Sequence, residues 1–189
     1  MTGVLYLIRH GESVSNAELP SSDPAGIPLT SKGHEQSAQL AQSWSHAPDL
    51  IVVSPFVRAR QSAMHLCERF PAAPVETWAV QEFVFINFRN ASAMTGKERR
   101  PLVEAYWQRC DPEEKNPDSE SFSEFWERVV NFRRRVARFD GKFIVVFSHG
   151  MFMKAFAYGS LHGFGPCSHE LMKAVYASQV AEPYVNACG

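Results

Sequence analysis

The sequence predicts an α/β protein built as a three-layer α/β/α sandwich, with a mostly parallel central sheet covered by helices on both faces. Apolar runs without polar alternation occur at residues 4–8, 49–54 and 142–147, and such runs are typical of strands buried on both faces. Segments with helical periodicity separate these runs. Strands that alternate with helices favour parallel pairing, because a parallel connection needs a long crossover segment.

Length and composition indicate one soluble domain over residues 1–189. The formal net charge of -1 gives no reason to expect nucleic acid or an acidic membrane surface as a partner. The chain has neither a signal-peptide pattern nor a run of about 18 apolar residues. Its four cysteines form no CxxC pair, so neither a zinc site nor a disulfide framework is indicated, and we expect a reducing cytoplasmic location. We also expect no metal and no cofactor. A homodimer stays open.

The first strand, Val4–Ile8, ends at Arg9-His10-Gly11-Glu12. Residues 13–28 are rich in Ser, Pro, Gly and Asn, which predicts a loop running over the end of this strand. Thr30 is a suitable N-cap for a helix with inward-facing Ala41, closed by Pro48. The guanidinium, imidazole and glycine at the end of the strand suit the binding of a small anion.

The second strand, residues 49–54, is followed at once by Pro55 and a helix. An apolar stripe from Phe56 to Phe70 marks that helix and leaves Arg58 off the stripe in the first turn. Val75 to Val80 is a weaker strand candidate, and Glu82 comes directly after it. Arg58 and Glu82 therefore follow strand ends, as His10 does.

The segment at about 85–119 has the least regular pattern and is predicted to be a capping insertion at the sheet edge. Within it, Pro101 to Cys110 reads as a helix, because proline suits the first helical position. We interpret its basic residues Lys97, Arg99 and Arg100 as a solvated approach to that helix. Behind it, Ser121 and Glu124 match a capping box, and apolar residues at helical intervals predict a long helix up to Phe139.

The last strong strand, residues 142–147, ends in Ser148-His149-Gly150. A helix is expected from about Met151 to Leu161, followed by a Gly/His/Pro loop. The tail, residues 175–189, has room for one more strand. If the strands are parallel, their carboxyl ends bring two histidines, two arginines and one carboxylate to one crevice, which is where α/β sheets bind ligands.

Five ordered sequence blocks within Val4–Gly150 resemble those of the histidine phosphatase superfamily, in its phosphoglycerate-mutase-like branch. They are LIRHGES (containing the RHG motif) with Asn16 four residues after Glu12, PLTSKG followed by Gln36, SPFVRARQSA, a Glu shortly after the third strand, and SHG after the last strong strand. The sequence departs from the family at Asp118 and Ser119, where glycines are usual.

The resemblance implies a phosphomonoester hydrolase that acts on a small phosphorylated metabolite through a phosphohistidine intermediate, without metal. It implies these roles in this chain: His10 as nucleophile, Glu82 as proton donor, Arg9, Arg58 and His149 as the phosphate pocket, and Asn16 as a further phosphate contact. Cations at Arg9 and Arg58 agree with this, because they disfavour protonation of His10 and keep it nucleophilic. Arg89 in the insertion is a candidate for holding a second acidic group of the substrate.

Three alternatives stay open at this point. A mutase would return the phosphoryl group to the substrate, but cofactor-dependent mutases of the family typically carry a larger insertion after the position of Glu82. A non-catalytic module would bind a phosphorylated ligand with the same residues. A metal-dependent hydrolase would use His10, Glu12, Glu82 and His149, although no pair of them has zincin-like spacing.

Overall fold

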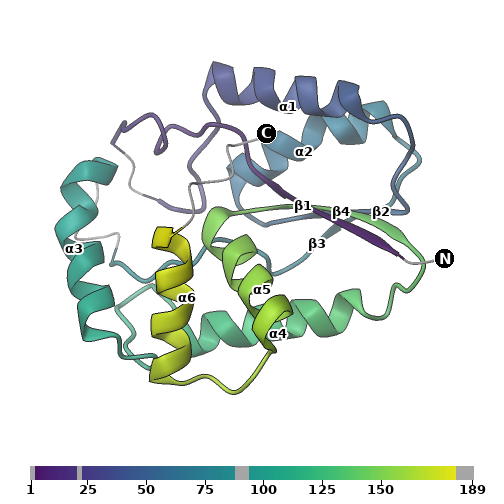
Figure 1. Ribbon diagram of the computed structural model, residues 1–189. Coiled ribbons are helices and arrows are strands. Elements are labelled where there is room, and N and C mark those ends of the chain that lie inside the picture. Colours follow the sequence, from purple (N-terminus) through teal and green to yellow (C-terminus); the bar gives the residue numbers. More distant parts are fainter. Residues whose placement is uncertain (1–2, 21–22, 88–93, 182–189) are drawn as a thin grey trace.

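The protein is described from a computed structural model, which covers residues 3–20, 23–87 and 94–181 (Figure 1). Within these residues four parallel strands form one sheet in the order β1-β4-β2-β3. The strands are β1 (Val4–Arg9), β2 (Leu50–Val53), β3 (Val75–Thr77) and β4 (Phe143–Ser148). The predicted parallel sheet is therefore confirmed.

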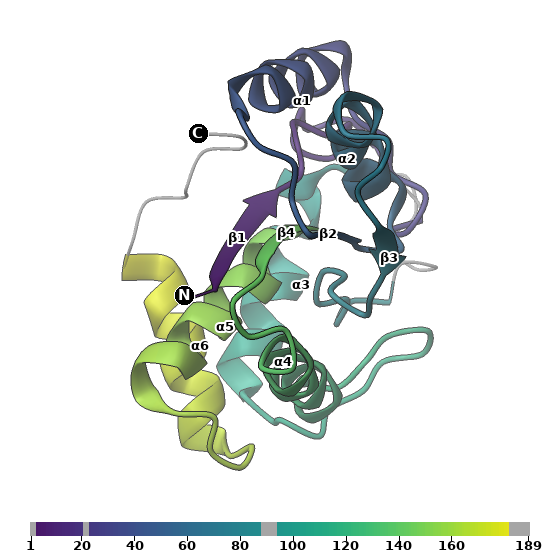
Figure 2. The same cartoon turned by 90° about the vertical axis from the view of Figure 1, so that its right-hand side faces the viewer.

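Helices cover both faces of the sheet, which confirms the three-layer prediction. On one face lie α1 (Ser31–Ser43) and α2 (Val57–Arg69), and on the other lie α4 (Phe122–Val136) and α5 (Gly150–His162), as Figures 1 and 2 show. Residues of α3 (Gly96–Arg109) and α6 (His169–Ala181) belong to the same core as those of α4 and α5. No helix of the described ranges has the length and apolarity needed to cross a bilayer.

The central strands are apolar throughout because their side chains feed two cores in alternation. In β2, Leu50 and Val52 belong to the core under α4 and α5, whereas Ile51 and Val53 belong to the core under α1 and α2. Successive side chains of a strand point to opposite faces, so a strand between two helical layers has no solvent-facing side. The unbroken apolar runs in the sequence have this origin.

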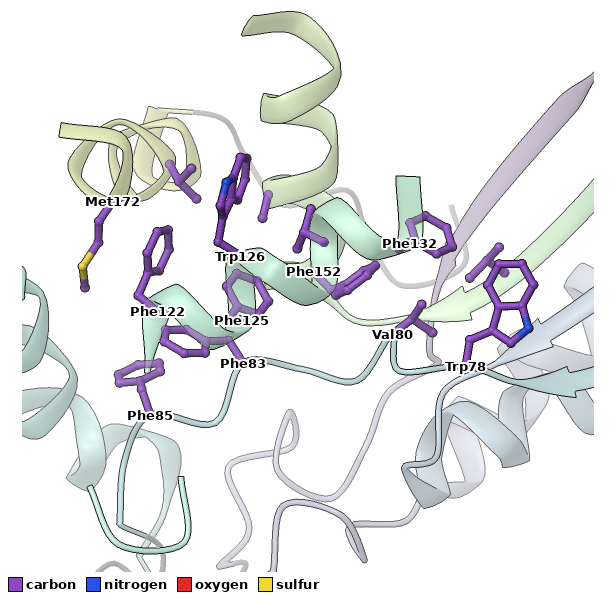
Figure 3. Packing of buried hydrophobic residues seen from close by; sticks show 14 of the residues in the cluster. Trp78, Val80, Phe83, Phe85, Phe122, Phe125, Trp126, Phe132, Phe152 and Met172 are labelled. Carbon is purple, nitrogen blue, oxygen red and sulfur yellow. The ribbon is translucent and has the colours of Figure 1, made fainter. Parts of the chain in front are cut away.

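An aromatic cluster fills the larger core, and the segment between β3 and α4 contributes Phe83 and Phe85 to it (Figure 3). The Phe83 ring lies 4.6 Å from the Phe125 ring of α4 and 4.9 Å from the Phe85 ring. Phe125 in turn contacts Phe152 of α5 at 6.3 Å between ring centroids. Ring contacts at these distances stabilise beyond their buried area. They hold the residues that follow β3, including Glu82, against the two helices.

The predicted helix caps are present. Thr30 caps α1, and its side chain accepts a hydrogen bond from the Gly33 backbone N–H. Ser121 and Glu124 form the reciprocal capping box of α4. Asp118, which stands where the family usually has glycine, adopts a left-handed backbone with φ of 59°. Aspartate tolerates this conformation better than most residues, so the loop keeps the shape that a glycine would favour.

Four predicted boundaries are wrong. Helix α3 begins at Gly96 rather than Pro101, because Thr95 and Glu98 form a second capping box. Strand β3 ends at Thr77 instead of Val80, where its pairing with β2 ends. Helix α4 ends at Val136 rather than Phe139. In the tail, residues 175–181 belong to helix α6 instead of a strand, whereas residues 182–189 lie outside the described chain.

Candidate active site

The candidate site lies where β1 and β4 end side by side. Arg9 pairs with Ser148 in the sheet, and the His10 backbone N–H donates to the Ser148 carbonyl at 3.1 Å. From β1 the chain turns to α1 on one face, and from β4 it turns to α5 on the other (Figures 1 and 2). Such a switch point leaves a crevice at the carboxyl edge of an α/β sheet. It brings His10 and His149 together, with ring centroids 5.1 Å apart.

A cavity of about 200 Å³ opens at this point. Five predicted site residues line it together, which are Arg9, His10, Asn16, Arg58 and Glu82. The rest of its lining comes from the loop after β1 and from the residues after Glu82, namely Ser13, Ser15, Pro24, Ile27, Phe83 and Val84. The lining therefore combines two guanidinium groups and a carboxylate with other polar and apolar groups.

His10 is held as a neutral imidazole of defined tautomer. Its side chain is buried, at 3% exposure, and Nδ1 lies 2.7 Å from the Gly11 carbonyl oxygen. A carbonyl can only accept, so Nδ1 carries the proton. Nε2 then presents its lone pair and accepts from Arg58 Nε at 3.1 Å. Burial, followed by the Arg58 cation, lowers the pKa of His10 to about 3, and the ring is neutral at physiological pH.

Arg58 is the second residue of α2, and its side chain is buried over the cavity. Besides His10, it donates through Nη1 to the Pro24 carbonyl at 2.6 Å and lies 5.0 Å from the centre of the Phe56 ring. Burial lowers its pKa to about 10, while nearby Glu82 acts in the opposite direction. The guanidinium therefore stays charged at neutral pH and faces the His10 lone pair.

His149 is fully buried as the residue before α5. Its Nε2 lies 2.8 Å from the Ser54 hydroxyl at the end of β2. Burial, and then the Arg58 cation, hold the pKa of His149 well below its usual value. Within the described residues Nδ1 has no hydrogen-bond partner. A buried polar atom in this state is free to meet a ligand.

Glu82 lies at the N-terminus of α5. Its carboxylate accepts the Met151 backbone N–H at 3.0 Å and the Phe83 backbone N–H at 3.2 Å. The preceding backbone is fixed by Arg128, whose Nη1 donates to the Ala79 and Gln81 carbonyls at 3.0 and 3.3 Å. Positioned by contacts on both sides, the carboxylate lines the cavity together with Arg9 and Arg58.

The loop after His10 is fixed by close backbone contact with α1. A Cβ at Gly33 would lie 2.1 Å from the Glu12 carbonyl oxygen, and one at Gly11 would lie 2.5 Å from the Gly33 carbonyl oxygen. That Glu12 carbonyl also accepts the Thr30 N–H at 2.9 Å. Both glycines are needed because the two backbones touch here.

Gly33→Ala is therefore expected to destabilise the protein by about 3 kcal/mol. Neither touching backbone can withdraw without breaking the hydrogen bond from the Thr30 N–H to the Glu12 carbonyl. Urea unfolding at neutral pH measures the loss. Gly165→Ala is the matched control, because a Cβ there meets nothing within 4 Å. Equal stabilities of the two variants would contradict the close approach.

Burial of a neutral His10 makes stability depend on pH. The unfolded chain binds a proton on this ring below about pH 6.5, and the folded chain binds it only near pH 3. Stability is therefore complete above the unfolded pKa and falls as pH drops, by up to about 1.4 kcal/mol per pH unit for this group.

Urea unfolding at pH 7, 6 and 5 tests this coupling. The free energy of unfolding of His10→Ala is expected to fall less steeply with acidification than that of the wild type. The difference between the two slopes should be up to about 1.4 kcal/mol per pH unit. His46→Ala, which replaces an exposed histidine, should follow the wild-type slope. Parallel curves for wild type and His10→Ala would show that His10 is not buried in its neutral form.

The segment between Glu82 and α4 contacts the cavity loop through polar groups. Arg99 Nη2 donates to the Ser15 hydroxyl at 3.1 Å, and the Lys97 backbone N–H donates to the Glu18 carboxylate at 3.0 Å. Arg99 is only 6% exposed, which corrects its interpretation as a solvated residue. These contacts tie the N-terminus of α3 to the loop that carries Asn16.

The structure thus gathers the predicted residues unevenly. Arg9, His10, Asn16, Arg58 and Glu82 line one cavity, and His149 lies directly beside His10. Arg89 lies outside the described residues and stays a prediction.

Glu12, a ligand in the metal-dependent alternative, is directed elsewhere. Its carboxylate accepts the Thr30 hydroxyl at 2.9 Å and the Lys32 ammonium at 2.9 Å. That alternative therefore loses one of its four donors.

Two serines that support the site were not identified from the sequence. Ser54 contacts His149, and the Ser62 hydroxyl accepts the Gly11 N–H at 3.0 Å while donating to the Arg58 carbonyl at 2.8 Å. Their position in the SPFVRARQSA block, four residues before and after Arg58, was the available signal. A serine after a strand or inside a helix is too common to single out without the fold.

Comparisons with known proteins agree with this geometry. Residues 5–178 match the family model of the histidine phosphatase superfamily, branch 1. An adenosylcobalamin/alpha-ribazole phosphatase of Salmonella typhi is 30% identical over 155 residues, which cover 77% of this chain and 73% of that protein. A 2,3-bisphosphoglycerate-dependent phosphoglycerate mutase of Nocardioides sp. is 31% identical over 109 residues, covering 56% of this chain and 43% of that protein.

Among solved structures, the alpha-ribazole phosphatase from Shigella flexneri superposes with a TM-score of 0.68 at 25% identity, over 89% of this chain and 82% of that one. The strand order, the two adjacent histidines and the family match over most of the chain lead to one conclusion: this chain belongs to the histidine phosphatase superfamily.

Proposed function

We propose that this protein is a metal-independent phosphomonoester hydrolase that uses His10 as nucleophile and forms a phosphohistidine intermediate. The observation that carries the proposal is the state of His10. The Gly11 carbonyl fixes its proton on Nδ1, and the buried Nε2 keeps an unprotonated lone pair beside the Arg58 cation at the cavity. A nucleophilic imidazole must be neutral with an unprotonated attacking nitrogen, and this state of His10 supports the proposed role.

The phosphate pocket follows from the charges around Nε2. Arg9 and Arg58 supply guanidinium groups, which make paired hydrogen bonds to phosphate oxygens. Asn16 and His149 are assigned as further contacts of the phosphoryl group. Phosphoryl transfer is catalysed mainly by positioning and by stabilisation of charge on the equatorial oxygens, and a rigid pocket with two cations supplies both.

In the first step Nε2 of His10 forms a bond to phosphorus while the bond to the leaving oxygen breaks. Glu82, in its protonated form, gives a proton to the departing alkoxide. In the second step the Glu82 carboxylate takes a proton from water, whose oxygen attacks the phosphohistidine and releases inorganic phosphate and free His10. Two in-line transfers replace one difficult hydrolysis.

The substrate is assigned as a small phosphorylated metabolite. A cavity of about 200 Å³ suits a phosphoryl group with a small organic group attached. The similarity to an adenosylcobalamin/alpha-ribazole phosphatase favours a hydrolase. Arg89 is kept as a candidate contact for a second acidic group, and the cytoplasmic location and a homodimer are kept as predictions.

The runner-up is a phosphoglycerate mutase, which the similarity to the Nocardioides protein favours. Both reactions share the phosphohistidine and differ in whether water or the bound product receives the phosphoryl group. A third reading keeps the pocket without catalysis, as a binding module for a phosphorylated ligand.

A substrate panel separates the readings. We expect release of inorganic phosphate from at least one member of a set of sugar phosphates, phosphoglycerates, nucleotides and phosphoamino acids, unchanged after exhaustive chelation. Efficient exchange of phosphoglycerate isomers in the presence of 2,3-bisphosphoglycerate, with little phosphate released, would establish the mutase instead. Tight phosphate binding with no turnover and no label on His10 would favour the binding module, and activity lost on chelation would revive the metal-dependent alternative.

A further inference from the structure

Ser54 is a buried group that contacts a proposed site residue, His149, and that the proposed mechanism does not use. It follows β2, is 0% exposed, and places its hydroxyl oxygen 2.8 Å from His149 Nε2 across a separation of 95 residues. The same oxygen accepts the Phe56 backbone N–H at 3.2 Å. Within the described chain these two groups are the hydrogen-bond partners of the hydroxyl.

These contacts decide which way the hydrogen bond to His149 runs. The Phe56 N–H can only donate, so the hydroxyl proton of Ser54 has a single acceptor within the described residues, which is Nε2 of His149. If Nε2 carried a proton instead, the buried Ser54 hydroxyl proton would have no acceptor, and such a group is costly to leave unsatisfied. Nε2 is therefore the unprotonated nitrogen.

The remaining ring proton then lies on Nδ1, the atom of His149 that has no partner within the described residues. We propose that Ser54 is a positioning residue that holds neutral His149 in its Nδ1–H tautomer, so that it donates a hydrogen bond to the phosphoryl oxygens without becoming an imidazolium. This inference rests on the proposed function, since it assumes a phosphoryl group in the cavity. The low pKa of His149 agrees with a neutral ring before substrate binds.

In this arrangement two adjacent histidines have opposite roles, one as nucleophile and the other as hydrogen-bond donor. Both rings are buried and neutral, with centroids 5.1 Å apart. A backbone carbonyl draws the proton of His10 to Nδ1 and leaves the lone pair on Nε2. A hydroxyl donor occupies Nε2 of His149 and leaves an N–H at Nδ1. One partner thus makes a nucleophile and the other makes a hydrogen-bond donor.

Long-range proton–nitrogen NMR correlation on the uniformly ¹⁵N-labelled wild type tests the tautomer directly. At pH 7, with and without inorganic phosphate, we expect a pyrrole-type Nδ1 and a pyridine-type Nε2 for His149, assigned by comparison with His10→Ala. A protonated Nε2, or two protonated nitrogens in the free protein, would overturn the proposal. This measurement needs neither activity nor a Ser54 variant, so its failure is distinct from failure of the proposed function.

Kinetics of Ser54→Ala supply the second readout. Removing an oxyanion donor outright costs about 10²–10³ in kcat, and we expect a smaller loss of about tenfold, because part of the population keeps the productive tautomer. His149 should show mixed tautomers in this variant, and Ser54→Thr, which keeps the hydroxyl, should restore one tautomer and most of kcat.

The matched control is Ser37→Ala, which removes an equally buried hydroxyl that donates to the Gly33 carbonyl in α1. Ser37→Ala should leave the His149 tautomer and kcat unchanged. If Ser54→Ala also left both unchanged, or if both alanine variants lost kcat equally without a change of tautomer, Ser54 would be structural only and the proposal would fall.

Discussion

His10→Ala is expected to lower kcat by about 10⁴-fold or more, the scale of loss when a covalent nucleophile is removed. Nε2 of His10 keeps an unprotonated lone pair beside Arg58 at the cavity, and alanine offers no atom to accept the phosphoryl group. Initial rates on the best substrate of the panel measure the effect. After rapid quenching of the wild type, label from the substrate phosphate that survives alkali but is lost in acid shows that the phosphoryl group is trapped on a histidine.

The control for this variant is His46→Ala, which removes an exposed histidine and should keep both rate and label. Binding of inorganic phosphate by calorimetry should survive in His10→Ala, because the arginines that attract the anion are unchanged. Activity close to that of the wild type in His10→Ala would refute the assignment of the nucleophile. Loss of phosphate binding together with activity would point to a disturbed pocket instead.

Arg58→Ala is expected to lower kcat/KM by about 10³-fold, since a forked guanidinium supplies two charge-assisted hydrogen bonds worth roughly 1.5–3 kcal/mol each. The same substitution removes the cation beside His10, so the pKa of His10 should rise from its low value. A rise in this pKa moves the acidic limb of the rate profile to higher pH, because a protonated imidazole cannot attack.

The pH dependence of kcat/KM therefore separates the two effects of Arg58. Arg58→Lys keeps a charge without the fork, so it should hold the acidic limb near the wild-type position and recover only part of the rate. Arg60→Ala, on the exposed face of the same helix, is the matched control and should change neither. An acidic limb that stays in place in Arg58→Ala would show that Arg58 does not set the ionisation of His10.

Errors of the sequence interpretation have local and tertiary causes. The start of α3 follows a local signal, the capping box of Thr95 and Glu98, and Pro101 lies inside the helix instead of at its first position. Burial of Arg99 could not be seen in the same way, since it depends on the loop of Ser15, 84 residues away in sequence. Such contacts are set by packing, which overrides the polar composition of a segment.

The sequence by itself determined the parallel sheet and the edge of the sheet that carries the candidate site. Unbroken apolar runs required helices on both faces, and the RHG and SHG blocks after β1 and β4 required their histidines to meet at one edge. These are consequences of chain periodicity and of where parallel strands end.

Only the tertiary structure decided the state of those histidines. The neutral forms of His10 and His149 depend on burial, and their tautomers depend on partners as distant as Ser54. A proton is placed by the acceptors and donors that surround a ring in space, and no local pattern of residues contains that information. The sequence thus located the two imidazoles. The fold gave His10 an unprotonated Nε2 and His149 an N–H at Nδ1.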